Sequence, residues 1–155
     1  MSTKFTQKNI PMVDSQSLKL LQSTVKLNDV ITKTVSNHLI EKGYTAVTPS
    51  LLSFLSILEC GVNFGSEIAR KLDVSRQMVA KTVKALCHLG YLEQKNGVGK
   101  QKEIHFTETG EQLMSDARQM LSDIDELILN HLNIMQPQYL IQDLTVIANA
   151  IEQKS

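Results

Sequence analysis

Residues 66–90 read SEIARKLDVSRQMVAKTVKALCHLG. The first seven residues have the apolar spacing of a short helix, and Asp73 and Val74 follow as a tight turn. Ser75 is suited to cap a second helix, and Gly90 is the residue type that commonly follows the last helical turn. Two short helices joined by such a turn form a helix-turn-helix unit.

The next segment predicts a β-hairpin. Residues 91–95 and 101–106 are expected to be strands around the tip Asn-Gly-Val-Gly at residues 96–99. The glycines stand where a hairpin turn wants a positive φ. A helix-turn-helix that is followed at once by a two-stranded hairpin is a winged helix.

Helices are also predicted before this unit. Residues 15–42 carry two apolar stripes, which indicate a long helix that is buried on more than one side and ended by Gly43. Thr48 and Pro49 are typical of an N-cap and a first helical residue, and Gly61 is expected to close that second helix.

The two ends of the chain differ. The first dozen residues lack periodicity and are expected to form an arm, whereas residues 107–132 predict a helix with a heptad-like seam that breaks at Met135–Pro137. A final helix carries an apolar stripe at Leu140, Leu144, Ile147 and Ile151. A winged helix this small cannot cover the apolar surface at both ends, so we expect an obligate homodimer built from them.

Composition excludes several protein classes. The 155 residues suit one compact domain, and 42% apolar residues are enough for a core. Aromatic residues make up only 5%, with 7 Gly and 3 Pro, which disfavours a β-sandwich or barrel. No apolar run is long enough for a membrane span or a signal peptide, so a cytoplasmic protein without membrane contact is expected.

A net charge of zero hides an uneven distribution. Residues 65–105 carry eight cations and four anions, a net charge of +4, whereas residues 106–155 carry two cations and eight anions, a net charge of −6. A basic middle indicates a polyanionic partner. Uneven decoration of a solvated surface is the alternative, and charge alone does not separate the two.

The second helix of the helix-turn-helix has two opposite sides. On a helical wheel, Val79, Val83 and Leu86 fall within one arc and must pack against the domain, while polar side chains fall on the other. A helix in the major groove needs amide or guanidinium groups near its N-terminus, and lysines suit phosphates. The predicted DNA-contacting residues are Ser75, Arg76 and Gln77 at the helix start, with Lys81 and Lys84 farther along.

Lysines also mark the predicted hairpin. Lys95, Lys100 and Lys102 are placed to follow a phosphate backbone or a minor groove, although solvated lysines are common on hairpins. Residues 96–100 contain two glycines and a lysine, but they lack the spacing and the terminal Ser or Thr of a P-loop, and no helix follows. We therefore reject a nucleotide site.

Four short motifs occur in a fixed order. They are Thr48-Pro49-Ser50, Glu67-Ile68-Ala69, Val79-x3-Val83-x2-Leu86-x3-Gly90-Tyr91-Leu92 and Phe106-Thr107-Glu108-Thr109-Gly110. Together they resemble the MarR family of bacterial winged-helix transcription regulators. The resemblance implies a mainly α dimer with a β-hairpin wing, which binds pseudo-palindromic double-stranded DNA and is released by a small-molecule effector or by cysteine oxidation. It assigns residues 45–106 to DNA binding and residues 1–44 and 107–155 to dimerisation.

The wing departs from the family pattern. The family carries an Asp-x-Arg pair where this chain has Val98 and Lys100, and it carries an Arg where this chain has Gln94. Lys100 keeps a positive charge but lacks the planar fork of a guanidinium group. The resemblance therefore supports the wing contacts less than it supports those of the helix-turn-helix.

No pattern indicates an enzyme, a cofactor or a metal site. Cys60 and Cys87 cannot form a disulfide framework or a four-ligand zinc site, and we expect buried structural thiols rather than sensors. No nucleophile–base arrangement is evident. The four histidines show no i, i+4 pairing that would suit a metal; they are His38, His88, His105 and His131.

The sequence therefore predicts an effector-responsive, sequence-specific DNA-binding transcription regulator, and it leaves the choice between repression and activation open. Two alternatives remain open. A winged helix that contacts only proteins would use its basic surface for an acidic partner. A dimerisation module of an enzyme such as a methyltransferase is disfavoured, because 155 residues leave no room for a catalytic domain.

Overall fold

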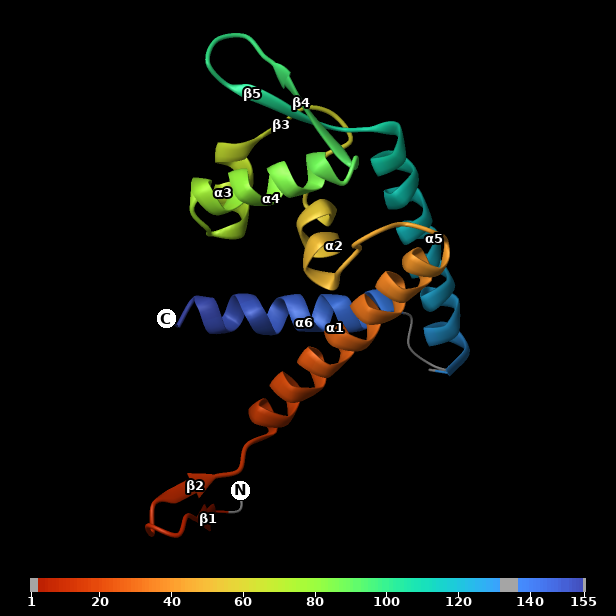
Figure 1. The fold of residues 1–155 in the computed structure, drawn as a ribbon. Helices are drawn as coiled ribbons and strands as arrows, with labels where there is room; N and C mark the ends of the chain where they lie inside the picture. The colour runs from red at the N-terminus through yellow and green to blue at the C-terminus, as the bar shows by residue number, and fades with distance from the viewer. Residues whose placement is uncertain (1–2, 132–136, 155) are drawn as a thin grey trace. The chain divides into compact units, whose positions relative to one another are not determined.

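The computed structural model describes residues 3–131 and 137–154, and the chain divides into two compact units, Met1–Leu55 and Ser56–Ser155. The first unit contains β1 (Thr3–Phe5), β2 (Pro11–Val13), α1 (Gln16–Glu41) and most of α2 (Pro49–Ser56) (Figure 1). The second contains β3 (Asn63–Phe64), α3 (Gly65–Leu72), α4 (Arg76–His88), β4 (Leu92–Asn96), β5 (Lys102–Phe106), α5 (Glu108–His131) and α6 (Pro137–Glu152). This mainly helical architecture with a small sheet confirms the predicted fold class. Among the described residues, no helix has the length and apolar character needed to cross a membrane.

Residues 3–13 form a hairpin, which corrects the expectation of an arm without regular structure. β1 and β2 pair as antiparallel strands, and every residue of both is exposed. Asn9 adopts a positive φ of 60° in the connecting turn. Three-residue strands are too short to show an alternating pattern, and the turn lacks the Asn-Gly or Asp-Gly pair that signals a hairpin.

α1 begins and ends where predicted. The Ser15 hydroxyl oxygen accepts a hydrogen bond from the Leu18 N–H (3.2 Å), and Gly43 follows the helix with a φ of 101°. Val35 and Leu39 are buried near its C-terminal end. The predicted burial on more than one side is not found in the single chain. The apolar residues of the first half are exposed, namely Leu18, Leu20, Leu21, Val25 and Leu27.

α2 begins after its predicted N-cap Thr48, whose hydroxyl accepts a backbone N–H at 3.2 Å, but it ends at Ser56 instead of continuing to Gly61. The buried Asn63 side chain explains the early end. Its Oδ1 accepts from the Glu59 N–H (2.8 Å), and its Nδ2 donates to the Glu59 carbonyl (2.9 Å). These bonds hold the segment before β3 in a turn.

α3 and α4 form the predicted helix-turn-helix. Asp73 lies between them in the left-handed conformation, with φ 53°. The Ser75 hydroxyl accepts the Met78 N–H at 3.1 Å and so caps α4, as expected. One side of α4 packs into the unit through Val79, Val83 and Leu86, which are at most 1% exposed.

β4 and β5 form the predicted wing, and a third strand joins them. β3 pairs with β5 on the side away from β4, giving the order β3-β5-β4. The sequence did not predict β3, because a strand of two residues has no period. Since β3 leads directly into α3, the sheet connects the wing to the helix-turn-helix.

The two glycines of the wing tip have different roles. Gly99 has the expected positive φ of 87°, but the expectation fails for Gly97, which is not among the glycines with positive φ. A Cβ atom at Gly97 would lie 2.9 Å from Cγ of Glu103, so lack of space is the local constraint at Gly97.

α5 starts at a tightly bonded corner. The Thr107 hydroxyl oxygen accepts the Gly110 N–H at 3.0 Å and donates its own hydrogen to the Gly90 carbonyl. The seam residues Leu113 and Ala117 are buried. α5 is described as far as His131, so its predicted end at residue 132 lies outside the described residues.

α6 begins at Pro137, and the Met135 and Gln136 positions of the predicted break lie outside the described residues. None of its residues is buried, even though the helix is rich in Leu, Ile and Val. The predicted stripe of the final helix therefore has no cover in the part of the chain that is described.

Candidate nucleic-acid interface

α4 presents an exposed polar side opposite its buried one. Arg76 and Gln77 lie in its first turn, directly after the exposed cap Ser75, and Lys81 and Lys84 follow along the same helix. All five predicted residues are exposed. In the described part of the chain, no carboxylate forms an ion pair with the three cations among them.

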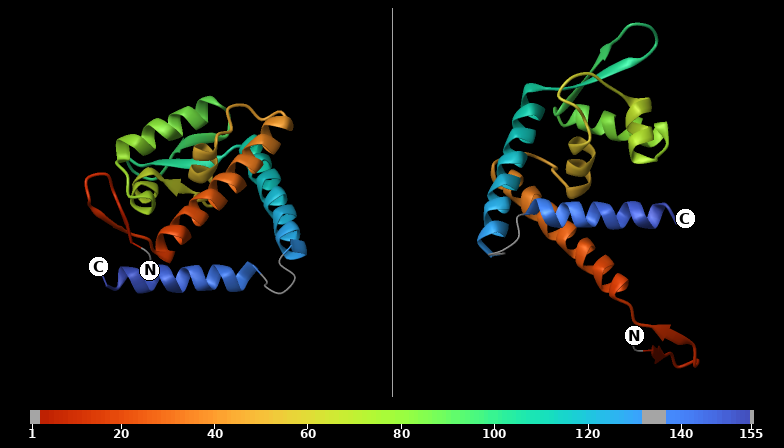
Figure 2. Two further views of the ribbon diagram at one scale, coloured as in Figure 1. Left: turned by 90° about the horizontal axis from the view of Figure 1, so that it is seen from below. Right: turned by 180° about the vertical axis from the view of Figure 1, so that it is seen from behind.

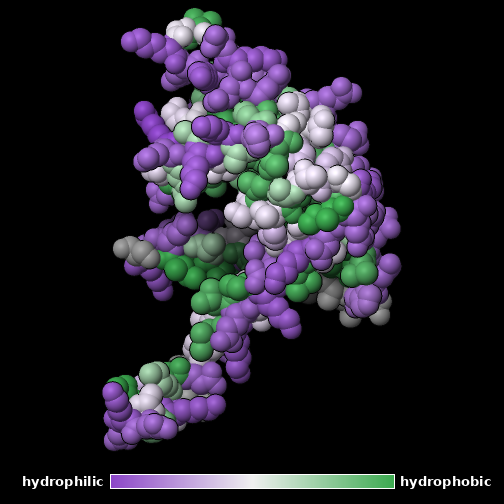
Figure 3. Space-filling view, viewed as in Figure 1, coloured by the Kyte–Doolittle hydropathy of each residue, from purple (hydrophilic) through white to green (hydrophobic). Residues whose placement is uncertain are grey.

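The three predicted lysines of the wing do not lie on one common face. In the β4–β5 register, Lys102 shares a face with Gln94 and Ile104, and these three residues line a groove against α4. Lys95 lies on the opposite face, where its ammonium group is 2.9 Å from a carboxylate oxygen of Glu93. Figure 3 shows hydrophilic side chains over most of the wing.

The outer face of the wing, which is the face opposite the groove, carries charged or ionisable residues on both strands. Glu93 stands opposite His105, and Lys95 stands opposite Glu103. The His105 ring is 2.9 Å from Glu103. Lys95 thus belongs to a face of alternating charges. Lys100, in the tip, is exposed and has no ion pair among the described residues.

A groove of about 270 Å³ runs between α4 and the inner face of the wing. It brings together two predicted residues, Arg76 and Lys102, which are 26 positions apart in the sequence. Val79, Val83 and Ile104 supply apolar lining. The groove also contains polar residues that the sequence analysis did not assign to the site, namely Ser66, Gln94 and Gln101.

Two exposed apolar side chains were also missed. Met78, in the first turn of α4, is 57% exposed, and Val98 at the wing tip is fully exposed. An apolar side chain on a DNA-facing helix can contact a thymine methyl group. The signal available in the sequence was the position of Met78 off the buried arc of α4, beside Gln77.

The expectation of buried thiols is wrong for Cys60. This residue is exposed, because α2 ends four residues earlier and Cys60 lies in the turn that follows. Cys87 is half-buried. Burial raises the pKa of the Cys87 thiol above its ordinary value, and the negative charge of Glu93 raises this pKa further.

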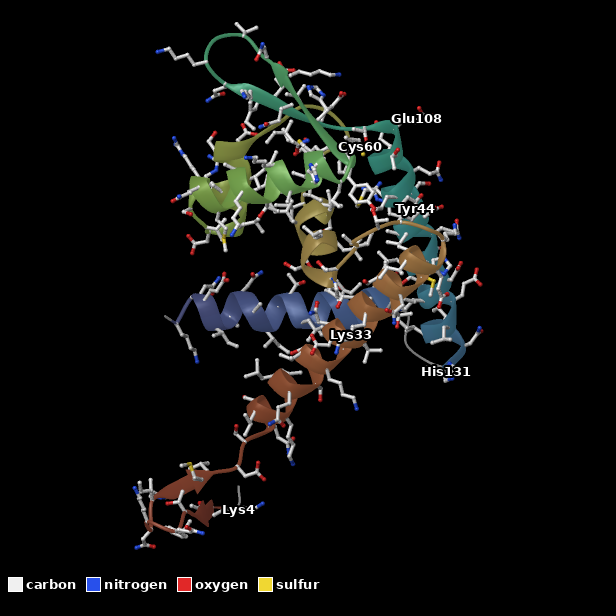
Figure 4. All side chains as sticks on the ribbon, in the orientation of Figure 1. Lys4, Lys33, Tyr44, Cys60, Glu108 and His131 are labelled. Carbon is white, nitrogen blue, oxygen red and sulfur yellow. The ribbon has the colours of Figure 1, made fainter. Side chains whose placement is uncertain are left out.

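Cys60 lines a cavity of about 530 Å³. Figure 4 shows Cys60 near Glu108, the first residue of α5. Leu58, Phe106 and Met114 supply an apolar lining. Arg118 contributes a cation that forms no ion pair within the described residues. The remaining lining residues are polar: Glu111, Ser115 and Gln119. Five of the eight lining residues follow one stripe of α5.

Comparison with known proteins rests on structure alone, since no family model and no curated protein sequence matches the chain. A MarR protein from Peptoclostridium difficile is 16% identical with a TM-score of 0.71, covering 94% of this chain and 93% of its own. FabT of Streptococcus pneumoniae, solved in complex with DNA, is 15% identical with a TM-score of 0.71, covering 92% of this chain and 100% of its own.

The organohalide-sensing regulator RdhR-CbdbA1625, solved in its 2,4-dichlorophenol-bound form, is 13% identical with a TM-score of 0.69. The match covers 89% of this chain and 82% of that protein. These three matches cover 89% to 94% of this chain. The chain therefore has the winged-helix fold of the MarR-family transcription regulators.

Proposed function

We propose that this protein is a cytoplasmic transcription regulator of the MarR type that binds double-stranded DNA. The observation that carries the proposal is the exposed polar side of α4, which carries Gln77, Lys81 and Lys84, with Arg76 exposed at the helix start beside the groove. In the described structure, Arg76, Lys81 and Lys84 form no ion pair. An α-helix with an amide near its start and lysines behind it suits the major groove.

The contacts divide by chemistry. Gln77 is suited to read a base, since a glutamine amide pairs bidentately with adenine. Ser75 and Arg76 stand beside it at the helix start. The lysines hold phosphates, which adds affinity without reading sequence. We assign Lys81, Lys84, Lys100 and Lys102 to this role, and Lys95 to a secondary one because it is paired with Glu93.

The DNA-binding species is proposed to be a homodimer. α6 has no buried residue, and the apolar residues in the first half of α1 are exposed, so both helices carry surface that a second copy can cover. A two-fold dimer places two recognition helices on half-sites about one helical turn apart. The operator is therefore expected to be pseudo-palindromic.

Selection of bound sites from random duplexes, followed by fluorescence anisotropy on the selected and a scrambled site, tests this function. We expect a symmetric site that binds at least 10³-fold more tightly than the scrambled duplex, with affinity falling as salt rises. Failure to bind any duplex, with retention of an acidic protein partner instead, would support the protein-interaction alternative.

We also propose that the cavity beside α5 binds a small effector. Its apolar lining, with Arg118 at one side forming no ion pair among the described residues, suits a compact, largely apolar molecule with an anionic group. The structural neighbour RdhR-CbdbA1625 was solved with 2,4-dichlorophenol, a molecule of this class in its ionised form. Bound effector is proposed to shift the spacing of the two recognition helices in the dimer.

Calorimetric titration with 2,4-dichlorophenol and with benzoate tests the effector site. We expect Arg118→Met to weaken binding of the anionic probe at least tenfold. Arg70→Met removes the same charge from α3, which does not line the cavity, and serves as the matched control. Equal binding by both variants and the parent would refute the assignment.

A further inference from the structure

The β1–β2 hairpin has an apolar face without cover. Because side chains alternate along a strand, the register places Phe5 and Val13 on one face and Lys4 and Met12 on the other. Phe5 is 64% exposed and Val13 is 60% exposed. A lone two-stranded hairpin is marginally stable in water, so this face needs a partner surface.

The hairpin cannot obtain that cover from the core of its own unit. It precedes α1, whose buried residues begin only at Val35. The helix between Gln16 and Val35 is about 28 Å long, at a rise of 1.5 Å per residue. Figures 1 and 2 show the hairpin projecting from the N-terminal end of α1. Its partner must therefore come from elsewhere.

α6 offers a surface of matching character. Its stripe runs through Leu140, Leu144, Ile147 and Ile151, with no residue of the helix buried. On a helical wheel, Asp143 borders this stripe. α6 contains two carboxylates and no cation, whereas residues 3–13 contain Lys4 and Lys8 and no carboxylate. The hairpin as a whole is therefore positively charged and α6 negatively charged, which favours their approach, while the contact itself is between their apolar faces.

We propose that the hairpin of one copy packs its Phe5–Val13 face on the α6 stripe of a second copy. This inference rests on the homodimer proposed above. Each copy carries one hairpin and one α6, so a two-fold dimer forms the contact twice. The hairpin is then a clamp between copies, with the Lys4–Met12 face left toward solvent.

Analytical ultracentrifugation of the full chain tests the clamp. Val13→Lys should raise the monomer–dimer Kd at least tenfold, and Phe5→Ser should have the same effect. Met12→Lys is the matched control, because it adds the same charge on the opposite face, and its Kd should stay within twofold of the parent. All three positions are exposed, and unchanged circular dichroism spectra would verify that the variants fold.

Cross-linking identifies the surface that is contacted. In a chain with Cys60→Ser and Cys87→Ser, a Val13→Cys copy and a differently tagged Ile147→Cys copy are mixed and oxidised with oxidised glutathione. We expect a mixed disulfide between the two tagged chains, and none when Met12→Cys replaces Val13→Cys.

The outcomes separate the two proposals. A monomeric parent would overturn the homodimer and the clamp together. A dimeric parent with an unchanged Kd in Val13→Lys and Phe5→Ser would overturn the clamp alone. A chain that carries both Val13→Cys and Ile147→Cys and forms the disulfide only within itself, or a hairpin variant that loses DNA affinity while dimerising normally, would also overturn it.

Discussion

A Cβ atom at Gly110 would lie 2.0 Å from the carbonyl oxygen of Tyr91. The same carbonyl accepts the N–H of Thr107 at 3.1 Å. The first turn of α5 is therefore seated directly on the backbone between α4 and the wing. This contact explains the glycine of the Thr-Glu-Thr-Gly motif by lack of space, since its neighbour is main chain and cannot swing away.

Gly110→Ala is expected to lower the free energy of unfolding by about 3 kcal/mol or more, because α5 must shift to admit the methyl group. Urea denaturation followed by circular dichroism measures the change. Gly61→Ala is the control, as nothing lies within 4 Å of a Cβ there. Equal stability of the two variants would show that the corner is loosely packed.

Gln77→Ala is expected to cost about 1–3 kcal/mol of binding free energy on the selected operator and to relax preference at one base pair in each half-site. On a scrambled duplex the same variant should bind like the parent. Anisotropy titrations on both duplexes measure this. A uniform loss on all duplexes would reassign Gln77 from base reading to the backbone.

Lys102→Ala is expected to weaken binding to all duplexes and to lower the salt slope by roughly one unit for each contact removed. Lys95→Ala should have little effect on the slope, because Lys95 lies on the outer face and is paired with Glu93. Titrations at four salt concentrations compare the variants. A larger effect for Lys95 would mean that DNA approaches the outer face of the wing.

Cys60 is expected to react with iodoacetamide faster than Cys87 at pH 8. The thiolate is the reactive form, and a raised pKa leaves the Cys87 thiol with a smaller thiolate fraction at any pH below that pKa. Cys87 is also half-buried, whereas Cys60 is exposed. Mass spectrometry of quenched samples gives both rates. Cys60→Ser should remove the fast phase, and faster labelling at Cys87 would contradict the burial.

The elements that were predicted correctly have their causes close by in the sequence. Ser75 and Thr48 each cap a helix, because the side-chain hydroxyl accepts a hydrogen bond from the backbone N–H three residues later. The buried arc of α4 follows from helical periodicity alone. Caps and periodicity act over a few residues, and for that reason one sequence is enough to find them.

The missed features depend on contacts that leave no periodic pattern in the sequence, and some of these contacts join residues far apart in the chain. β3 forms because Asn63 pairs with Ile104, 41 residues later. α2 ends early because the Asn63 side chain accepts a hydrogen bond from the Glu59 N–H and holds the segment after the helix in a turn. The groove joins Arg76 to Gln101, and the pairing of Lys95 with Glu93 depends on which face of the wing each occupies. The face of the wing on which each lysine lies is set by the pairing of β4 with β5. Counting charges in the sequence could therefore not distinguish Lys95 from Lys102.

β3 has a mechanical consequence. Its two residues pair with the wing strand β5, the central strand of the sheet, and they are also the last residues before α3. A displacement of the wing would thus be transmitted through Asn63 and Phe64 to the start of α3, because no loop separates β3 from this helix. In the proposed DNA complex, this connection would set the spacing between the wing and α4, and we expect a duplex to contact both only where the spacing of its adjacent grooves matches.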